Sequence, residues 1–355
     1  MTQSTTHTQQ RAVGRGRIAI FVALVVVCAV AGTAIVLRSR ADDPTKGTCE
    51  ARNVTLSSAK FTALMAEPHV VFKSTDTCPT NGDVEVVPTS KPDGPRAIAP
   101  IKCDRVAAVA TGGVCLRIDN SSFFAKYSGA IFDHNFQVTH TFPLPGLPSR
   151  ARMSPDGHWA AMTVFVHGDS YSSAAFSTRT MFVDTNTGFA TEDLEKFRVT
   201  DNGKDVKSVN RNYWGVTFTD DSDHFYATLG RNNDIQLIEG SVSSRSAHTV
   251  RSGIECPSLS PDQTHLAYKS RVGGTLTAVK WRLHVLDLRT GHDVALAETR
   301  SVDDQVEWLD DNTVLYAILR SPVGTAVFDT YRVPADGSGH PELYLKSAWS
   351  PSVGG

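Results

Sequence analysis

The chain has 355 residues, of which 41% are hydrophobic and 20% are charged. This composition supplies enough apolar material for a packed core and excludes a disordered, collagen-like or multi-spanning membrane protein. The formal net charge is −2, but residues 1–40 hold five arginines and no acid, so the remainder carries 30 basic and 37 acidic side chains. An acidic body argues against nucleic acid as a partner. The length indicates either two domains or one fold that grows by repetition.

An apolar stretch of twenty residues without a charge runs from Ile18 to Leu37. As a helix it is long enough to cross the hydrocarbon core of a bilayer once. The acid-free residues 1–17 favour a signal anchor, with this tail in the cytoplasm and the large C-terminal part outside the cell membrane. The alternative is a cleaved signal peptide with a candidate cleavage site at Ala29-Val30-Ala31. Residues 38–58 then form a polar linker.

From residue 59 onward, runs rich in Val, Ile, Phe, Tyr and Thr alternate with Gly, Asp, Asn and Pro, which is an all-β pattern. A unit recurs in which a short strand, a turn, an alternating apolar strand and a third strand follow one another. The turns start 44, 44, 65, 41 and 49 residues apart, at Ala66, Ala110, Ser154, Thr219, Ser260 and Leu309. Six units of four antiparallel strands predict a six-bladed β-propeller over residues 59–346, preceded by the transmembrane helix and followed by a C-terminal tail, 347–355.

The alternation of apolar and polar residues identifies the strands of the repeat. Those that follow the turns begin at His69, Val114, His158, His224, His265 and Thr313. The third strands begin at Asp83, Met181, Asp234, Leu283 and Phe328, with a weaker one around Gly129. Because no single small sheet can bury both of its faces, we expect each sheet to pack against two neighbours around a ring.

Three turn motifs carry a family resemblance. They are Ser154-Pro155-Asp156-Gly157 followed by Trp159, Ser260-Pro261-Asp262 followed by Leu-Ala-Tyr-Lys-Ser, and Asp287-Leu288-Arg289-Thr290-Gly291. They resemble the TolB-like propeller repeat, a bacterial relative of WD-type repeats, and the resemblance covers about residues 59–346. It implies the propeller fold and no particular activity, because such repeats occur in translocation factors, in peptidase caps and in anchored proteins. The chain has no room for the small α/β domain of TolB and shows no hydrolase domain.

The mouth of the central channel is the expected place for a small ligand, because the inner strands of successive blades begin there. The side chains at or near these strand starts are Asp104, Arg150, Arg211, Glu255 and Asp304. A mixed ring of acids and arginines suits a peptide terminus or a sugar. The competing interpretation is that all five are solvated loop residues.

No linear motif identifies a catalytic residue, a cofactor or a metal ligand, and none is predicted. The nearest serine-hydrolase match, at residues 168–172, ends in the wrong residue, and the twelve histidines lack zinc-site spacing. Asp156, Asp220 and Asp262 are expected to cap the backbone amides of their turns. A calcium site at paired acids such as Asp310-Asp311 is the alternative.

Five cysteines follow the apolar segment, which fits an oxidising compartment. Cys78 lies in the loop after the second strand of blade 1 and Cys103 in the link to blade 2, so we expect both at one end of the propeller and bonded to each other. A hairpin that turns at Thr111-Gly112 places Cys115 opposite about Val109, out of register for Cys103. The remaining pairing stays open.

These patterns favour a membrane-anchored extracytoplasmic propeller that serves as a non-catalytic binding or scaffold module for a protein or another cell-envelope component. The rival hypothesis is a propeller enzyme of the lactonase, lyase or glycosidase type. Its site at the channel mouth would consist of scattered acids with a calcium ion, which leave no linear motif.

Overall fold

In the computed structural model, the chain divides into two compact units, Met1–Thr48 and Cys49–Gly355. The structure describes residues 58–76, 80–166, 177–191, 193–207, 210–231, 234–275, 278–320 and 326–354, all in the second unit. The expected tail 1–17, membrane segment 18–37 and linker up to residue 57 lie outside these residues. Within the part of the chain that is described, no helix has the length and apolar character to cross a bilayer.

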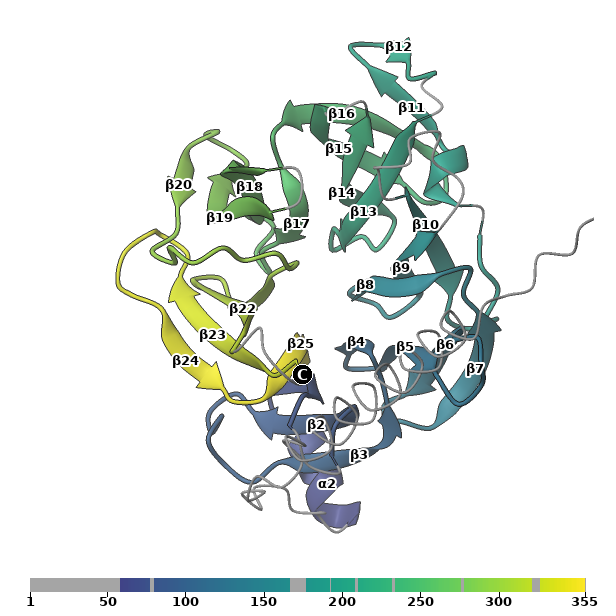
Figure 1. The fold of residues 1–355 in the computed structure, drawn as a ribbon, viewed down its shortest axis with the longest axis vertical. Coiled ribbons are helices and arrows are strands. Elements are labelled where there is room, and N and C mark those ends of the chain that lie inside the picture. The colour runs from purple at the N-terminus through teal and green to yellow at the C-terminus, as the bar shows by residue number, and fades with distance from the viewer. Residues whose placement is uncertain are drawn as a thin grey trace, which may run out of the picture. The chain divides into compact units, whose positions relative to one another are not determined.

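Six β-sheets are arranged in a ring around a common centre (Figure 1), which confirms the predicted six-bladed β-propeller. Blade 1 consists of β25 (Ala348–Gly354), β1 (His69–Ser74), β2 (Asp83–Pro88) and β3 (Ala97–Lys102). Blade 2 consists of β4 (Arg105–Val109), β5 (Gly112–Asp119), β6 (Lys126–Asp133) and β7 (Val138–Pro143). Blade 5 consists of β17 (Glu255–Leu259), β18 (His265–Thr275), β19 (Ala278–Asp287) and β20 (Asp293–Ala295). Blade 6 consists of β21 (Glu307–Asp310), β22 (Thr313–Leu319), β23 (Phe328–Pro334) and β24 (Glu342–Leu345).

The C-terminal segment closes the ring. Residues 347–355 were expected to be a tail, and this expectation is wrong, because β25 pairs antiparallel with β1 from His69↔Gly354 to Ser74↔Ala348. The yellow β25 therefore lies with the first, purple strands in Figure 1. The sequence did not indicate a strand here because Pro351 interrupts the segment and its partner, β1, lies near the other end of the described chain.

A short helix, α2 (Ser58–Met65), stands where the repeat predicts the first strand of blade 1. Its Leu64 is buried, and Phe61 and Met65 pack against the apolar core between blades 1 and 2. The Phe61 ring meets Phe136 edge-on at 5.8 Å between centroids. The helix thus covers part of this core, while the inner strand of blade 1 comes from the other end of the chain.

Blades 3 and 4 depart from the four-strand pattern. Blade 3 has three strands, β8 (Leu147–Met153), β9 (Trp159–Val166) and β10 (Ser177–Asp184). Blade 4 has the usual β13 (Arg211–Phe218), β14 (His224–Arg231), β15 (Asp234–Ser241) and β16 (Ser246–Ser252), extended by β11 (Arg198–Asp201) and β12 (Lys204–Asp205). The segment expected to complete blade 3 instead pairs in parallel with β16, from Arg198↔Ser246 to Thr200↔His248. This arrangement uses part of the long spacing between the third and fourth turns.

Side chains cap the edge of β10 that a fourth strand would cover. The backbone amide of Thr180 donates to the Glu195 carboxylate at 3.2 Å, and that of Thr178 donates to Asn212 Oδ1 at 2.9 Å. Glu195 belongs to the 3-10 helix η2 (Leu194–Lys196), which follows β10. Blade 3 tolerates three strands because these groups satisfy the edge amides.

The core is divided into six apolar clusters, one between each pair of neighbouring blades. Successive side chains of one strand enter different clusters: in β5, Val114 and Leu116 face blade 3, whereas Cys115 faces blade 1. In β1, Val70 and Phe72 likewise face blade 6. Each sheet therefore buries both of its faces. Successive side chains of a strand point to opposite faces, and each face packs against a neighbouring blade.

The aspartate turns fold as capped hairpins. Asp156 Oδ1 accepts from the Ser154 hydroxyl at 2.6 Å and from the His158 amide at 2.8 Å. Asp262 repeats this arrangement in its own turn, so the expected capping role of both is confirmed. In the third such turn the cap is Asp221 and not the expected Asp220, because Asp221 holds the third position of its turn, as Asp156 does in its own.

These turns also bind one another from blade to blade. The amide of Asp156 donates to Ser222 Oγ of blade 4 at 3.2 Å, and that of Asp262 donates to Asp311 Oδ1 of blade 6 at 2.9 Å. Gly157, at φ +78°, lies so close to blade 2 that a Cβ there would stand 2.0 Å from Thr111 Oγ1. These turns therefore join neighbouring blades in addition to capping their own hairpins.

The disulfide differs from the prediction. Cys103 is bonded to Cys115, with their Cα atoms 5.3 Å apart, so Cys78 is not its partner; Cys78 itself lies outside the described residues. The predicted register was wrong by three residues, because the hairpin turns tightly and places Cys115 opposite Val106, not Val109. Cys103 lies just before β4, where the chain bends back, and this bend brings the two sulfur atoms together.

The first prediction concerns ring closure. The buried Ser352 hydroxyl donates to the Ala108 carbonyl at 3.0 Å and accepts from the Ala108 amide at 2.9 Å, joining β25 to β4. We expect Ser352→Ala to lower the free energy of unfolding by about 1–3 kcal/mol, because both groups of Ala108 lose a buried partner. Chemical denaturation measures this loss. Ser338→Ala, in an exposed turn, is the control, and equal stability of the two variants would contradict the assigned closure.

The second prediction concerns the disulfide. Trypsin cleaves after Lys102, Arg105 and Arg117, so peptide 103–105 should appear linked to peptide 106–117 by mass spectrometry without reduction. Reduction should lower the free energy of unfolding by about 3 kcal/mol, the value for a loop of this length. The double variant Cys103→Ala, Cys115→Ala should be insensitive to reductant, and a peptide that links Cys78 to Cys103 would refute the assignment.

Candidate functional site

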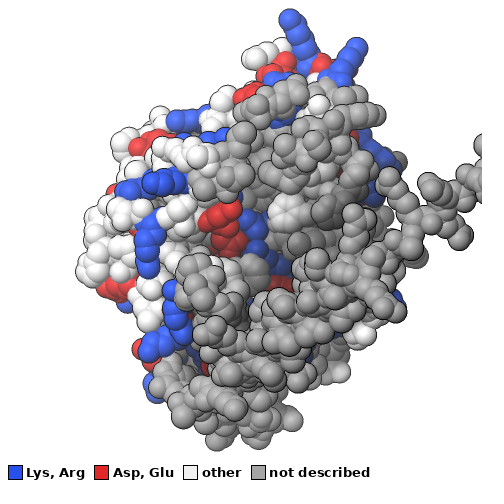
Figure 2. All heavy atoms as spheres, in the orientation of Figure 1, with Lys and Arg blue, Asp and Glu red and all other residues white. Residues whose placement is uncertain are grey.

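The inner strands β4, β8, β13, β17 and β25 surround the centre of the ring (Figure 1). In the space-filling view, basic and acidic side chains meet in the hollow near the middle of this face (Figure 2). A pocket in the channel is lined by Arg105, Val106, Ala107, Arg150, Ala151, Arg152, Asp304, Gln305, Glu307, Ser350, Pro351 and Ser352. The channel is therefore strongly charged.

Two of the predicted residues, Arg150 and Asp304, lie together in this pocket. Asp304 Oδ1 is 3.5 Å from Arg150 Nη1 and 3.3 Å from Nη1 of Arg105, and all three side chains are largely buried. Trp349 Nε1 donates to the second oxygen, Asp304 Oδ2, at 3.1 Å. One carboxylate thus serves two guanidinium groups from neighbouring blades.

The protonation equilibria of this cluster follow from burial and from that shared carboxylate. Burial opposes ionisation of Asp304, but Arg105 and Arg150 outweigh it and lower the pKa of Asp304. Burial lowers the pKa of Arg105 to about 10, because Asp304 compensates its desolvation only in part. Arg150 is also buried, yet the carboxylate of Asp304 raises the pKa of Arg150 overall. All three groups are ionised at neutral pH.

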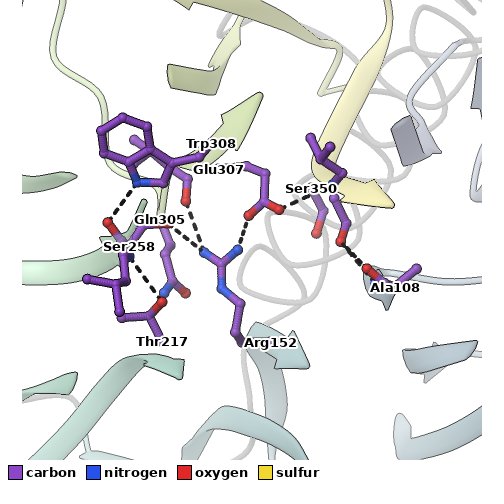
Figure 3. A network of polar contacts seen from close by, with 12 residues as sticks. Ala108, Arg152, Thr217, Ser258, Gln305, Glu307, Trp308 and Ser350 are labelled. Atoms are coloured by element: carbon purple, nitrogen blue, oxygen red, sulfur yellow. Dashed lines mark hydrogen bonds and ion pairs between the residues drawn. The ribbon is translucent and has the colours of Figure 1, made fainter. Parts of the chain in front are cut away.

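Arg152 of β8 forms a second tie across the channel (Figure 3). It makes an ion pair with Glu307 of blade 6, and its Nη2 donates to the Val306 carbonyl at 2.9 Å and to Ser258 Oγ at 3.4 Å. The other Glu307 oxygen accepts from the Val353 amide of β25 at 3.2 Å. A single guanidinium therefore links blade 3 to blades 5 and 6.

Neutral side chains make similar links around the same opening. Gln305 Nε2 donates to the carbonyls of Val216 and Pro257 at 2.9 and 2.8 Å, which joins blade 6 to blades 4 and 5. Trp308 Nε1 donates to the Ser258 carbonyl at 2.8 Å (Figure 3). The inner strands are thus held to one another by a polar network that lies around the channel.

Asp104 lies at the channel mouth and pairs with a lysine, not with the arginines of the pocket. Its Oδ1 accepts from Lys73 Nζ at 2.9 Å, and its Oδ2 accepts from the Ile118 amide at 2.7 Å. The carboxylate is partly exposed. Asp104 therefore fixes the junction of blades 1 and 2 and does not reach the arginine cluster.

Glu255, the first residue of β17, is buried beside Lys269, its cross-strand partner. Burial raises the pKa of Glu255, and the positive charge of Lys269 opposes this rise. Lys269 also makes an ion pair with the exposed Asp303 and lies 4.2 Å from the centroid of the Trp281 ring. Glu255 thus belongs to a second charged group on the blade 5 side of the mouth.

Arg211, the fifth predicted residue, is directed elsewhere. Its Nη1 donates to the Val206 carbonyl at 3.1 Å and its Nη2 donates to the Glu195 carbonyl at 2.6 Å. These carbonyls belong to the segment between blades 3 and 4. Arg211 therefore anchors that segment, although it occupies the predicted strand start.

Sequence reasoning missed Arg105, Arg152 and Glu307, which supply much of the charge in the channel. One signal was available: Arg150 and Arg152 are two residues apart in one strand, so they share a face. No sequence signal singled out Glu307. It is the first residue of the short strand β21, and its importance follows only from the position of that strand beside the channel.

Among the described residues, no group of three or more His, Cys, Asp or Glu side chains is arranged to hold an ion. Both acids considered for calcium, Asp310 and Asp311, accept hydrogen bonds from backbone amides, one within its own turn and one from the turn of blade 5. Asp310 accepts from the Asn312 amide and Asp311 from the Asp262 amide, at 2.8 and 2.9 Å.

Comparison with known structures supports the fold. The chain is similar to TolB from Acinetobacter baumannii, with a TM-score of 0.53 and 17% identity over 84% of this chain and 70% of that chain. Weaker similarities are found to a Mycobacterium tuberculosis puromycin-hydrolyzing peptidase (TM-score 0.46, 13% identity, 75% of this chain and 42% of that one) and to an oligogalacturonate lyase in complex with manganese (0.44, 10%, 74% and 76%). At such identities only the propeller fold is shared. No protein-family model and no curated protein sequence matches the chain.

The third prediction tests the tie across the channel. Arg152→Ala leaves Glu307 as a largely buried carboxylate without its counter-ion, so we expect a loss of about 3–5 kcal/mol in the free energy of unfolding. The double variant Arg152→Met, Glu307→Met should recover most of this loss, because no charge is then left buried.

Arg332→Ala is the matched control, because its ion pair with Glu342 is half exposed and such pairs contribute less than about 1 kcal/mol. Denaturant unfolding of the four proteins makes the comparison. If Arg152→Ala were as mild as Arg332→Ala, the channel tie would not be structural.

Proposed function

We propose that the chain is a single-span membrane protein whose extracytoplasmic propeller is a non-catalytic binding or scaffold module for a protein or another cell-envelope component. The apolar segment 18–37 supports the anchor. The disulfide between Cys103 and Cys115 supports an oxidising compartment outside the cytoplasm, because such bonds are rare in reducing ones.

The pairing of the acids in the channel carries the non-catalytic part of the proposal. Asp304 and Glu307 are engaged by arginines, Asp303 by Lys269 and Asp104 by Lys73. A general base or a nucleophile must be able to approach substrate, and acids held in ties between blades are poorly placed to do so. These side chains support the ring itself.

The loops around the mouth are the proposed binding surface. The loop between β5 and β6 carries Phe123 and Phe124, which are 95% and 77% exposed and lie edge to face at 4.9 Å. The bond between the Ile118 amide and Asp104 places this loop on the mouth side of the ring. Two exposed aromatic rings on a rigid scaffold are typical of a protein-binding surface.

The rival enzymatic function has one observation in its favour. Glu255 is buried beside Lys269 and near the exposed Asp303, and burial raises its pKa, which favours the protonated form more than in an ordinary glutamate. If the protein turns over a lactone, an oligosaccharide or a uronate polymer, Glu255→Gln should abolish that turnover and leave the unfolding temperature nearly unchanged.

The fourth prediction tests the binding surface. A photo-reactive benzoylphenylalanine is placed at position 123 of the full chain in the cells that naturally produce it, and the membranes are illuminated and washed with alkali. We expect a covalent adduct with one defined partner, retained in the washed membrane. The matched control is the same substitution at Phe189, which is 76% exposed but follows β10 at the opposite end of the blades.

Adducts from position 189 and not from 123 would place the partner on the other face. Turnover of a substrate by the purified chain would replace the binding proposal with the enzymatic one.

A further inference from the structure

We infer that the middle of the channel is a binding site for a single small oxyanion, either a free anion such as phosphate or a carboxylate group borne by a peptide. The inference goes beyond the proposed function, because such a site exists whether or not a partner binds to the loops or a membrane lies nearby.

Three guanidinium groups face two carboxylates in the channel pocket. Arg105 and Arg150 share Asp304, and Arg152 is paired with Glu307. The pocket is lined by all five of these side chains. One positive charge is therefore left over within the pocket.

Two acids outside the pocket, Asp303 and Glu255, act on Arg150, but each interacts mainly with Lys269. Lys269 is paired with Asp303, and Lys73 is paired with Asp104. The remaining acid is Glu255, whose raised pKa favours its neutral form more than for an ordinary glutamate and whose nearest base is Lys269. Glu255 does not line the pocket.

Unused donors give a second, independent argument. The Nε atoms of Arg105, Arg150 and Arg152 are buried, and the described part of the protein offers none of them a hydrogen-bond partner. A buried donor without an acceptor costs about 1–3 kcal/mol, more when it is charged, so three of them around one pocket call for an acceptor. An oxyanion presents several lone pairs and suits the fork of donors on a guanidinium.

The surroundings also hold the arginines in place. The Arg105 guanidinium lies 3.8 Å from the centroid of the Trp349 ring, and Arg150 contacts the buried thiol of Cys256. Burial lowers the pKa of Arg105 to about 10, because the charge of Asp304 offsets its desolvation only in part, whereas the pKa of Arg150 is raised. An anion between them would supply the missing compensation. The enclosed part of the pocket is small, so the site suits one oxyanion group and not a chain of sugars.

The fifth prediction is an anion-dependent gain in stability. The full chain in detergent is melted in a buffer free of chloride and phosphate, with sodium phosphate, sodium acetate or a short peptide with a C-terminal aspartate added. We expect a saturating rise of about 5 °C in the unfolding temperature with at least one of them. A rise with phosphate alone identifies a free anion, whereas a rise with the peptide that its amidated, neutral analogue does not give identifies a carboxylate borne by a chain.

Arg105→Gln should lose the rise, and Arg332→Gln, on the exterior, should keep it. A rise that is equal in both variants, or that follows ionic strength and not the kind of anion, would overturn the inference. A crystal of the unaltered chain grown with selenate gives a second readout that no variant can confound. A selenium peak between the three arginines is expected, with selenate oxygens within hydrogen-bond distance of their nitrogens, and water alone at that position would refute the site.

Discussion

The pairing of β25 with β1 is the contact on which the ring depends. A propeller blade buries both faces only while it has a neighbour on each side. Blade 1 meets blade 6 through Val70 and Phe72 and blade 2 through Val71, so an open ring would expose apolar surface on two blades at once. The serine hydroxyls of β25 extend the closure to β4. The last seven described residues thus stabilise every blade through its neighbours.

Local chemistry made most of the strands predictable. The strands His69–Ser74, Asp83–Pro88 and Thr313–Leu319 have the starting residues that alternation and turn motifs indicated. The failures concern pairings that no local pattern encodes. The partner of β1 lies about 280 residues away in sequence, and the fourth strand of blade 3 is lost because its segment pairs with β16 of the next blade.

The candidate site was predictable only in part, for related reasons. The inner strands begin at the channel mouth, so the strand starts correctly predicted that Arg150 and Asp304 lie together. The position of a residue in a strand does not determine, however, where a long side chain points. Arg211 turns to two carbonyl groups between blades 3 and 4. The disulfide was predicted wrongly because the expected register between β4 and β5 was off by three residues. The hairpin turns more tightly than its Thr-Gly-Gly motif suggested.

The channel joins its strands in two chemically different ways, and the difference bears on function. Ser352, Gln305 and Trp308 make neutral hydrogen bonds to backbone groups, which hold neighbouring strands without burying a charge. Buried ion pairs achieve the same at a desolvation cost that often makes them no better than apolar contacts. Since neutral ties suffice elsewhere around the ring, stability alone does not account for three guanidinium groups in one pocket. A cationic cluster with unused donors is better explained by a ligand that carries negative charge into the channel.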